Sequence, residues 1–384
     1  MKKTTKVLSL ALCIVMVLSL LAGCGKSEGS KNATGYKIGV LVADASGEEA
    51  LAFKNYYTEY VAKQYGVEFI YSEALADEAA AKAQAETFIA QNCKAIIDMA
   101  DKDRAAIAKL CNENKVYYAI ASGVMTDDDF AASKGYEYFV GQVGPDTMSE
   151  YYAGVAMGEY YKGKVSKVAI YSAFLPNPMH VYRTAGIITG LGDTYKGNSG
   201  MAMVGDLFAS NGAVDVADIA GDTDVIYYFQ GFVGYGNVGT IDDAIAAGPD
   251  AVLGAGMMTT FYSANLNAAG IEFSDIDAFT GMAGDAMQNG KLTYLEGKYA
   301  SSIGPVFALI QSAMNGAPIR DAEGNAVSVA QGYAVATSYE EYQNAATADA
   351  GENPTYSKAV LDTIIGTSDK AVTYDAFKSV VDAH

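Results

Sequence analysis

The sequence predicts an α/β protein with two doubly wound parallel sheets, one in each half of the chain. Short apolar runs alternate with segments of helical spacing from Tyr36 onward, a pattern typical of parallel strands joined by crossover helices. The alternation starts again near Lys167, after a long helical segment at 146–161. The length of 384 residues also favours two domains over one.

The first half contains five short runs that we expect to be strands buried on both faces, because they are apolar without a polar alternation. These runs lie at 37–43, 67–72, 94–99, 116–121 and 138–141. Helices are expected at 46–65, 77–92 and 103–114. The first helix begins with Ser46 and Glu49 in the spacing of a capping box, and Asp77 stands at the N-cap position of the second.

The second half repeats this organisation without repeating the sequence. Strands are expected at 167–172, 201–207, 225–229, 251–255 and 277–280, and helices at 182–190, 238–247 and 260–268. In sheets of this type, ligands bind beyond the carboxyl ends of the strands, where the strand order reverses. Two such edges that face each other predict a ligand cleft between two lobes.

The N-terminus predicts export and lipid attachment. Three lysines precede the apolar run 7–21, and Ala22, Gly23 and Cys24 follow it, which gives the three parts of a signal peptide. A membrane-spanning helix is the alternative, but the run is shorter than the ~20 residues of a span. The segment resembles the lipobox of bacterial lipoproteins, which implies cleavage after residue 23 and a diacylglyceryl group on Cys24. The protein is then expected on the extracytoplasmic face of the cell membrane, with residues 24–35 as a flexible tether.

Charge and composition exclude several classes of function. The net charge is −19, and −22 without the three lysines of the signal segment, so a nucleic-acid partner is not expected. His180 and His384 are the only histidines, and no G-x-S-x-G or C-x-x-C motif occurs, so we predict no enzyme, metal site or cofactor. Cys93 and Cys111 remain after export. They form a disulfide or, as their apolar helical surroundings favour, two buried free thiols.

Several short segments resemble one known family in their order and spacing. They include 138–146 (YFVGQVGPD) followed by Ala153 and Gly154, then 248–252 (GPDAV), 289–292 (NGKL) and 302–304 (SIG). On these segments the chain from 36 to 337 resembles the type I periplasmic binding proteins, the substrate-binding subunits of ABC importers, and most closely their sugar-binding branch. The resemblance implies a monomer that captures a small organic solute, sugar-like or another polar or aromatic metabolite, and delivers it to an ABC permease. A lipid-anchored sensor of the same fold is the alternative.

The same resemblance implies a hinge of three chain segments, near 142–145, 296–300 and 316–330. The first lobe is then expected at 36–143 plus 299–318, and the second at 144–298 plus 330–384. Residues 339–384 extend beyond the usual end of the family. A capping box of Ser338 and Glu341 predicts that this extension starts as a helix packed on the second lobe.

Candidate ligand contacts are the polar and aromatic residues that follow the predicted strands. On the first lobe they are Asp44, Ser46, Asp98, Asp101, Ser122 and Gln142, and on the second Phe174, His180, Arg183, Gln230, Phe232, Tyr235, Thr280 and Lys298. Carboxylates accept hydrogen bonds from hydroxyl groups, guanidinium groups donate in pairs, and aromatic faces stack on rings. Simpler explanations stay open: Ser46 as a helix cap, Asp98 and Asp101 as loop acids or caps, His180 as a structural residue, and Arg183 in a surface salt bridge.

At the predicted site, this chain lacks several polar residues that are typical of the family. Sugar-binding members usually carry an Asp-Arg or similar pair where this chain has Ser122 and Gly123, often Asn or Asp where it has Gly256, and an acid where it has Thr280. A buried polar group without a partner costs about 1–3 kcal/mol. A site without these anchors is therefore expected to fit a ligand with fewer hydroxyl groups than a hexose or pentose.

Overall fold

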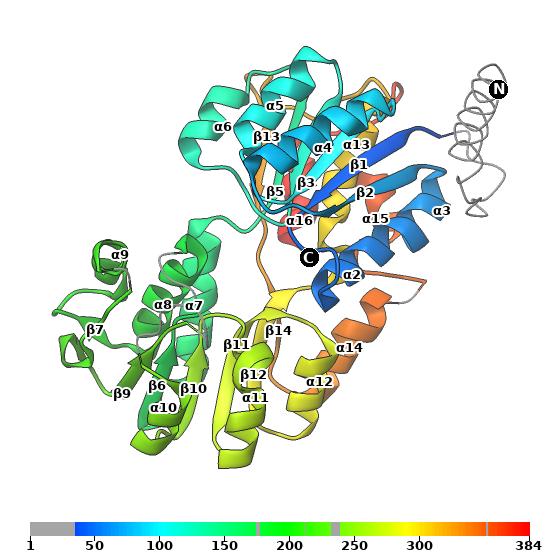
Figure 1. Ribbon diagram of the computed structural model, residues 1–384. Helices are drawn as coiled ribbons and strands as arrows, with labels where there is room; N and C mark the ends of the chain where they lie inside the picture. Colours follow the sequence, from blue (N-terminus) through cyan, green and yellow to red (C-terminus); the bar gives the residue numbers. More distant parts are fainter. Residues whose placement is uncertain (1–34, 174–176, 211, 232–238, 351) are drawn as a thin grey trace, which may run out of the picture.

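The computed structural model describes residues 35–173, 177–210, 212–231, 239–350 and 352–384. Two α/β lobes lie one above the other in the view of Figure 1, and crossing segments join them at the centre. Each lobe has a six-stranded sheet in the order of a doubly wound fold. This is the architecture that the alternation of strands and helices predicts.

The sheet of the first lobe is parallel throughout. Its order is β13-β5-β4-β3-β1-β2, with β1 at Lys37–Val42, β2 at Glu68–Ala74, β3 at Ala95–Met99, β4 at Tyr117–Ala121, β5 at Phe139–Gly144 and β13 at Val327–Ala330. The order reverses between β1 and β3. The carboxyl ends of these strands and of β4 therefore form the edge at which a ligand is expected.

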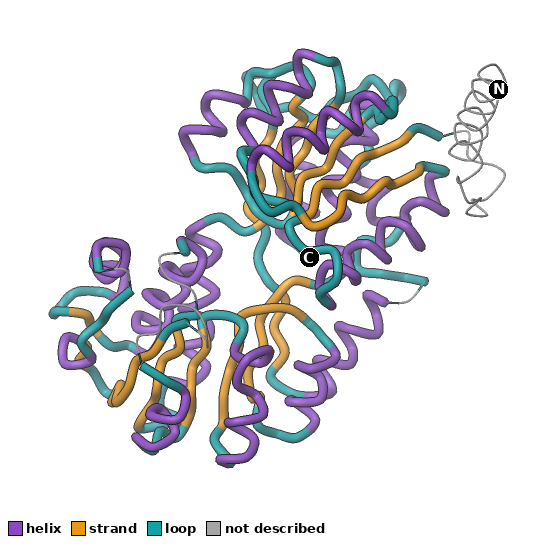
Figure 2. Tube along the Cα trace, viewed as in Figure 1, coloured by secondary structure: helices purple, strands orange, loops and turns teal. Residues whose placement is uncertain are grey.

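Helices cover both faces of this sheet, as Figure 2 shows. On one face, α4 (Glu78–Ala90) and α5 (Arg104–Glu113) enclose a core around Phe88, with α6 (Asp127–Ser133) beside α5. On the other face a larger set surrounds Phe307: α2 (Glu48–Asn55), a π-helical turn at Tyr56–Val61, α3 (Ala62–Tyr65), α13 (Gly304–Met314), α15 (Lys358–Ile364) and α16 (Tyr374–Asp382).

The second sheet has the order β14-β12-β11-β10-β6-β9. Its strands are β6 (Lys167–Tyr171), β9 (Asp224–Phe229), β10 (Ala251–Gly254), β11 (Glu272–Ala278), β12 (Leu292–Lys298) and β14 (Ala334–Ala336), and of these six β14 alone runs antiparallel to its neighbour. One face is covered by α7 (Thr147–Tyr161), α8 (Pro178–Leu191) and α9 (Met203–Ala209), with a small ribbon of β7 (Thr194–Tyr195) and β8 (Ile219–Ala220). The other face is covered by α10 (Ile241–Ala247), α11 (Met258–Ala269), α12 (Gly281–Gln288) and α14 (Tyr339–Ala350).

Helices α7 and α8 approach each other closely because glycines face the neighbouring backbone. A Cβ atom on Gly186 of α8 would lie 2.1 Å from the carbonyl oxygen of Tyr151, and one on Gly154 of α7 would lie 2.0 Å from that of Arg183. Any side chain would therefore push the two helices apart. The close approach places the first turns of α7 and α8 side by side at the edge of the second lobe.

Several predicted elements differ from the structure. Residues 201–207, expected to form a strand, belong to a 3-10 turn and to α9, because the buried side chains of Met203 and Leu207 follow a helical spacing of four. β11 is longer than the run predicted at 277–280, since its middle carries the buried polar residues Ser274 and Asp275. β12 and α6 have no counterpart in the prediction.

The described part of the chain passes between the lobes four times: after β5, after β12, between β13 and β14, and between α14 and α15. The first two passages lie where the resemblance implies hinge segments, and the third falls at 331–333, just after the expected one. The domain boundaries differ from the prediction at two places, because β13 pairs with β5 and the segment from Tyr356 onward joins the first lobe instead of the second. The physical reason is apolar burial: Tyr356, Leu361 and Phe377 fill the core beside α13, where none of them is exposed.

Cys93 and Cys111 are free, buried thiols, as their apolar helical surroundings favour. Burial raises the pKa of both groups, that of Cys93 to about 11, so both stay protonated near neutral pH. Among the described residues, no helix combines the length and the apolar character that crossing a membrane requires.

Candidate ligand cleft

A cavity of about 710 Å³ lies between the lobes, where the carboxyl ends of β1, β3 and β4 face the first turns of α7 and α8. The first lobe supplies most of the lining, including Asp44, Glu49, Asp101, Arg104 and Ser122, and the second supplies Asp146, Glu150, Asn177, Met179 and Lys298. A cavity of this volume suits a small organic molecule. No group of His, Cys, Asp and Glu side chains in the described part of the chain is arranged to hold a metal ion.

Four of the described non-glycine residues with a left-handed backbone conformation follow strands of the two sheets. Asp101 and Ser122 follow β3 and β4 with φ of 54° and 63°, and Ala173 and Met257 follow β6 and β10 with φ of 49° and 55°. A residue other than glycine pays roughly 1–2 kcal/mol for this left-handed conformation. Such strain persists where the surrounding structure imposes it, typically at binding sites.

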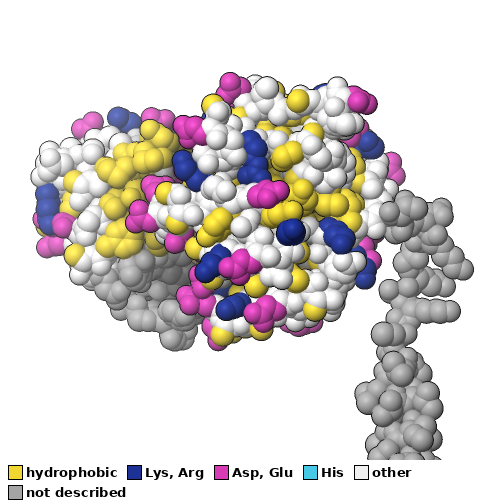
Figure 3. Space-filling view, turned by 90° about the horizontal axis from the view of Figure 1, so that it is seen from above, with side chains coloured by type: hydrophobic (Ala, Val, Ile, Leu, Met, Phe, Trp, Pro, Cys, Tyr) yellow, Lys and Arg dark blue, Asp and Glu magenta, His cyan; other side chains and the backbone are white. Residues whose placement is uncertain are grey.

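The described lining of the cavity is acidic. In the view of Figure 3, Lys and Arg side chains lie among Asp and Glu side chains, and neither sign forms one continuous region on that face. The described lining of the cavity, in contrast, carries eight carboxylate side chains and two cationic ones, Arg104 and Lys298. The cleft therefore presents a negative potential to an entering solute.

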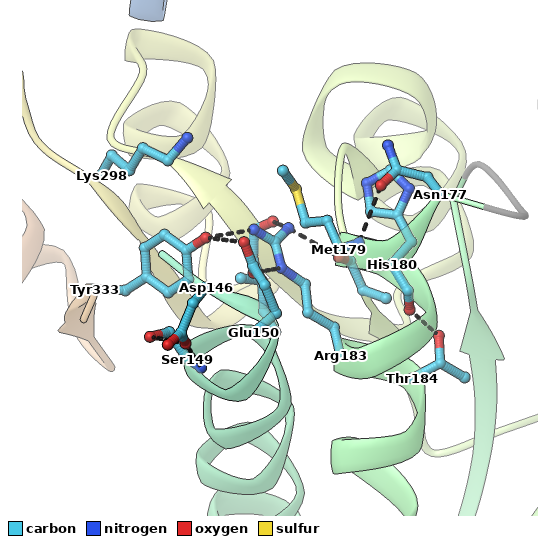
Figure 4. A network of polar contacts seen from close by, with 12 residues as sticks. Asp146, Ser149, Glu150, Asn177, Met179, His180, Arg183, Thr184, Lys298 and Tyr333 are labelled. Carbon is cyan, nitrogen blue, oxygen red and sulfur yellow. Dashed lines mark hydrogen bonds and ion pairs between the residues drawn. The ribbon is translucent and has the colours of Figure 1, made fainter. Parts of the chain in front are cut away.

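Arg183 is held by four hydrogen bonds within the second lobe (Figure 4). Its Nε donates to Glu150 at 2.6 Å, its Nη1 to the carbonyl oxygens of Ala255 and Ile276 at 3.1 and 2.7 Å, and its Nη2 to the Tyr333 hydroxyl at 2.8 Å. Tyr333 in turn donates to the second oxygen of Glu150 at 2.7 Å. Burial by itself would lower the pKa of the guanidinium, but Tyr333 and Glu150 raise it above its ordinary value. Arg183 therefore stays charged although it is 3% exposed.

This network joins three parts of the chain that meet at the hinge. Glu150 stands in the first turn of α7, just after the first passage between the lobes, and Tyr333 stands in the third passage. Arg183 on α8 bonds to both. In the structure its role is to fix the hinge segments to the second lobe, and the cavity is lined by Glu150 instead. Glu150 is an acidic residue in the first turn of α7, which is common because it suits the helix dipole, so the sequence contains no specific signal for its pairing with Arg183.

His180 lies one turn before Arg183, as Figure 4 shows, and is 5% exposed. Its carbonyl oxygen accepts a hydrogen bond from Thr184 at 2.8 Å. A Cβ atom on Gly256 would lie 3.0 Å from its Nε2, so the imidazole packs against the loop after β10. The absence of a side chain at Gly256 thus makes room for His180 and Arg183.

Between described residues, two hydrogen bonds connect the lobes directly across the cleft. The Lys298 ammonium group, at the end of β12, donates to the carbonyl oxygen of Ser122 at 3.4 Å. The backbone amide of Gly281, in the first turn of α12, donates to the Glu48 carboxylate at 2.7 Å. The structure therefore brings together Lys298 and Ser122, two residues that the sequence predicts to contact ligand from opposite lobes.

Asp44 organises the loop after β1. Its carboxylate accepts hydrogen bonds from the Ser46 and Gly47 amides at 2.9 and 3.0 Å, and these donors, the Ser46 amide first, lower its pKa. Gly47 rather than Ser46 occupies the N-cap position of α2. Asp44 lines the cavity, whereas Ser46 does not belong to its described lining.

Three other residues predicted to contact the ligand instead bond within the protein interior or cap a helix. Asp98 is fully buried and accepts hydrogen bonds from the Tyr118 hydroxyl and the Ala100 amide at 2.7 and 2.8 Å, while burial raises its pKa. Gln142 is 2% exposed and binds the Met125 amide and Ser328. Thr280 caps α12. None of these three side chains belongs to the described cavity lining.

Asp101 does line the cavity, and it is paired there with a residue that the sequence analysis missed. Arg104 stands at the start of α5, 9% exposed, and its Nη1 lies 3.0 Å from the Asp101 carboxylate and donates to the carbonyl oxygen of Val124 at 2.8 Å. A basic residue in the first turn of a helix is unfavourable for the helix dipole and usually lies on the surface. That conflict was the signal that could have identified Arg104.

The structure says little about the remaining predicted ligand contacts. Gln230 is buried at the end of β9, 3% exposed. Phe174, Phe232, Tyr235 and the predicted lipid attachment site Cys24 lie outside the described residues.

Glu296, near the end of β12, is expected to make the stability of the protein depend on pH. It is 5% exposed, and burial raises its pKa from 4.5 to about 8, against the opposing effects of the Tyr294 hydroxyl and Arg183. Between these two values the folded chain binds more protons than the unfolded chain, so the free energy of unfolding falls as pH rises. Glu296→Gln is expected to remove this loss and to be more stable than the parent by about 4 kcal/mol at pH 8, with little difference at pH 4.5.

Urea denaturation at pH 4.5, 6, 7 and 8 measures this difference. Glu272→Gln is the control, because Glu272 is an exposed residue at the start of the neighbouring strand β11. Equal pH slopes for the parent and Glu296→Gln would show that the pKa of Glu296 does not change on folding.

The two lobes with parallel sheets and the cleft between their strand ends define the fold of the type I periplasmic binding proteins, and solved structures of that fold resemble this chain. One is an ABC transporter solute-binding protein from Bacillus halodurans with bound myo-inositol, with 20% identity, 82% of this chain and 99% of that chain covered, and a TM-score of 0.53. Another, from Actinobacillus succinogenes with bound D-allose, has 15% identity, covers 81% of this chain and 100% of that chain, and has a TM-score of 0.58. A myo-inositol binding protein from Caulobacter has 15% identity, 82% and 98% coverage, and a TM-score of 0.53.

No protein-family model and no curated protein matches the sequence. At identities of 20% and below, the likeness to solved structures shows the fold, and it confirms the fold that the sequence resemblance implies. Several of these neighbours are described as solute-binding proteins.

Proposed function

We propose that the protein is a lipid-anchored solute-binding subunit that captures a small organic molecule between its lobes and delivers it to an ABC importer. The observation that supports this most strongly is the cavity of about 710 Å³ at the facing edges of two doubly wound lobes. Several solved neighbours hold a sugar or polyol, such as myo-inositol or D-allose, so these are the first ligand classes to test.

Ligand capture requires the lobes to move relative to each other. A solute that contacts both strand edges stabilises a closed form, because those contacts exist together only when the cleft is shut. The contacts Lys298–Ser122 and Gly281–Glu48 already connect the lobes. A lipid on Cys24 would hold this trap near a membrane partner and raise the effective concentration of loaded protein.

A ligand screen tests the capture step. The mature chain is combined with sugars, polyols, nucleosides, amino acids and aromatic metabolites, and thermal shift and small-angle X-ray scattering are recorded. A ligand at 100 times its Kd is expected to add about 2.7 kcal/mol of stability and to reduce the radius of gyration. If no solute of the panel stabilises or compacts the protein, the proposal fails.

The lipid anchor is tested separately. Cys24→Ser is expected to abolish labelling with a radioactive fatty acid and to release the protein from the membrane fraction. Cys93→Ser is the control, because Cys93 is a buried free thiol. Delivery is tested by measuring whether the loaded protein stimulates the ATPase activity of a candidate permease complex from the same organism.

A further inference from the structure

The four passages of the chain between the lobes are joined by a buried group of hydrogen bonds. Gln331, in the third passage, donates from its side chain to the carbonyl oxygen of Ser302 at 3.0 Å and from its backbone amide to that of Gly144 at 3.1 Å. The Tyr356 amide, after the fourth passage, donates to the Ser301 hydroxyl at 3.1 Å. All five residues are buried and belong to the first-lobe ends of the passages. We call them the hinge cluster.

Asp349 connects the second lobe to the hinge cluster. It is 6% exposed and lies near the end of α14. Its carboxylate accepts hydrogen bonds from the Ser301 amide at 2.5 Å, from the Ser301 hydroxyl, and from the Thr355 amide at 3.2 Å. A carboxylate can accept several hydrogen bonds, and each of them is stronger than a bond between neutral groups. Asp349 is therefore held at the hinge by three donors.

Helix α14 is fixed to the second lobe at its other end. The Tyr342 hydroxyl, in the first turn, donates to the carbonyl oxygen of Thr280 at 2.6 Å, and the Tyr342 ring stacks on Phe279. Figure 1 shows α14 beside α12 in the lower lobe, with its C-terminal end toward the upper lobe. A helix of 12 residues spans roughly 18 Å as a stiff rod. Helix α14 is thus a rigid connection between the lobes.

The carboxylate and part of its surroundings belong to the extension 339–384, which lies beyond the usual end of the family that the sequence resembles. The extension is fastened to the first lobe next to the hinge cluster. The Tyr56 hydroxyl donates to the carbonyl oxygen of Tyr356 at 2.7 Å, and the Tyr60 hydroxyl accepts from the Lys358 amide at 2.8 Å. The connection through α14 therefore adds to the three passages that the resemblance implies.

We infer that Asp349 is a clamp that fixes α14 to the hinge cluster and restricts the movement of the second lobe relative to the first. In a hinge made of chain passages alone, backbone rotations in a few residues absorb the movement. A helix bound to both lobes removes part of this freedom, so the lobes populate fewer relative orientations. A ligand that fixes one of these orientations then costs less conformational entropy. The inference goes beyond the proposed function, because it concerns the lobes and not the solute.

Distances between two spin labels, one on each lobe, test the clamp without any ligand. Pulsed electron spin resonance measures them on the mature chain with Cys24→Ser. The labels are attached at the exposed positions of Lys109→Cys on α5 and Glu272→Cys on β11, while the two native thiols are buried. Asp349→Ala is expected to broaden the distribution of distances between the lobes. A folded Asp349→Ala protein with the distribution of the parent would overturn the inference.

Hydrogen exchange measures the size of the local effect. The Ser301 amide donates to Asp349, so its protection is expected to fall about 10- to 150-fold in Asp349→Ala. Amides of β1 and β10, in the cores of the two lobes, are expected to exchange as in the parent. Equal loss of protection at all of these sites would show that Asp349 has a merely structural role and would refute the inference.

Two further variants assign the effect to the bond between the lobes. Asp349→Asn covers the case in which Asp349→Ala does not fold, because it keeps the shape of the side chain and one acceptor oxygen. It is expected to broaden the distribution less, and a distribution equal to that of the parent would contradict the inference. Asp362→Ala is the matched control, since Asp362 accepts a hydrogen bond from Tyr65 at 2.9 Å within the first lobe. Its distribution is expected to stay unchanged. Equal broadening in Asp362→Ala would refute the role of Asp349.

Discussion

Replacing Arg183 with methionine is expected to lower the free energy of unfolding by about 3–5 kcal/mol, because removal of one partner from a buried ion pair leaves the other charge uncompensated. Glu150 would remain 4% exposed with its main cationic partner gone. Tyr333 and the carbonyl oxygens of Ala255 and Ile276 would also lose their donor. Urea denaturation followed by far-ultraviolet circular dichroism measures the change.

Lys196→Met is the matched control for this prediction. Lys196 lies in the same lobe and makes an equally short ion pair, 2.7 Å to Asp206, but both side chains are half exposed. Its removal is expected to have a much smaller effect, since water replaces the partner of an exposed charge. If Arg183→Met instead keeps the stability of the parent and loses only ligand affinity, Arg183 is a ligand contact, as the resemblance implies.

Phe377→Ala is expected to lower the free energy of unfolding by about 3–5 kcal/mol, the usual cost of deleting a fully buried aromatic side chain. Phe377 belongs to the last helix, α16, and is 0% exposed in the core of the first lobe, which it shares with Phe307. Phe208→Ala is the control, because Phe208 is 40% exposed. Chemical denaturation of both variants measures the contrast.

Hydrogen exchange locates the effect of this substitution. In Phe377→Ala, amides of the first lobe around β1, β3 and α13 are expected to lose protection, while those of β6 and β10 keep it. Loss of protection in the second lobe instead would place the end of the chain where the sequence resemblance predicts it. The denaturation and the hydrogen exchange of Phe377→Ala together test whether the C-terminal segment of the chain packs in the first lobe.

That return has a consequence for the hinge. Asp349, at the end of α14, accepts a hydrogen bond from the backbone amide of Ser301 at 2.5 Å and from its hydroxyl group. Ser301 follows the second passage between the lobes, and the Tyr356 amide donates to its hydroxyl oxygen at 3.1 Å. The passages after β12 and after α14 are therefore bonded to each other.

Local patterns in the sequence were enough to predict the two-lobe architecture. The side-chain periods of strands and helices repeat over a few residues. A helix cap is also local, because its side chain bonds to an amide three residues further on, as Asp77 does to Ala80 and Asp146 to Ser149. The family resemblance added the order of the hinge passages. The prediction of strands from apolar runs was wrong at 201–207, where an apolar run forms a helix. It was also too short at β11, where the strand contains buried polar residues.

The sequence by itself determined the fold class, the cleft between strand edges and the acidity of the chain, because each follows from local periodicity or from composition. Only the tertiary structure decided what individual side chains do there. Arg183 meets acceptors 72, 93 and 150 residues further along the chain, and the Tyr56 hydroxyl meets the carbonyl oxygen of Tyr356, 300 residues away. A charged side chain can bond to distant partners, as Arg183 does, or line a cavity, as Arg104 does. Contacts between distant parts of the chain decide between these roles, and no local sequence pattern encodes them.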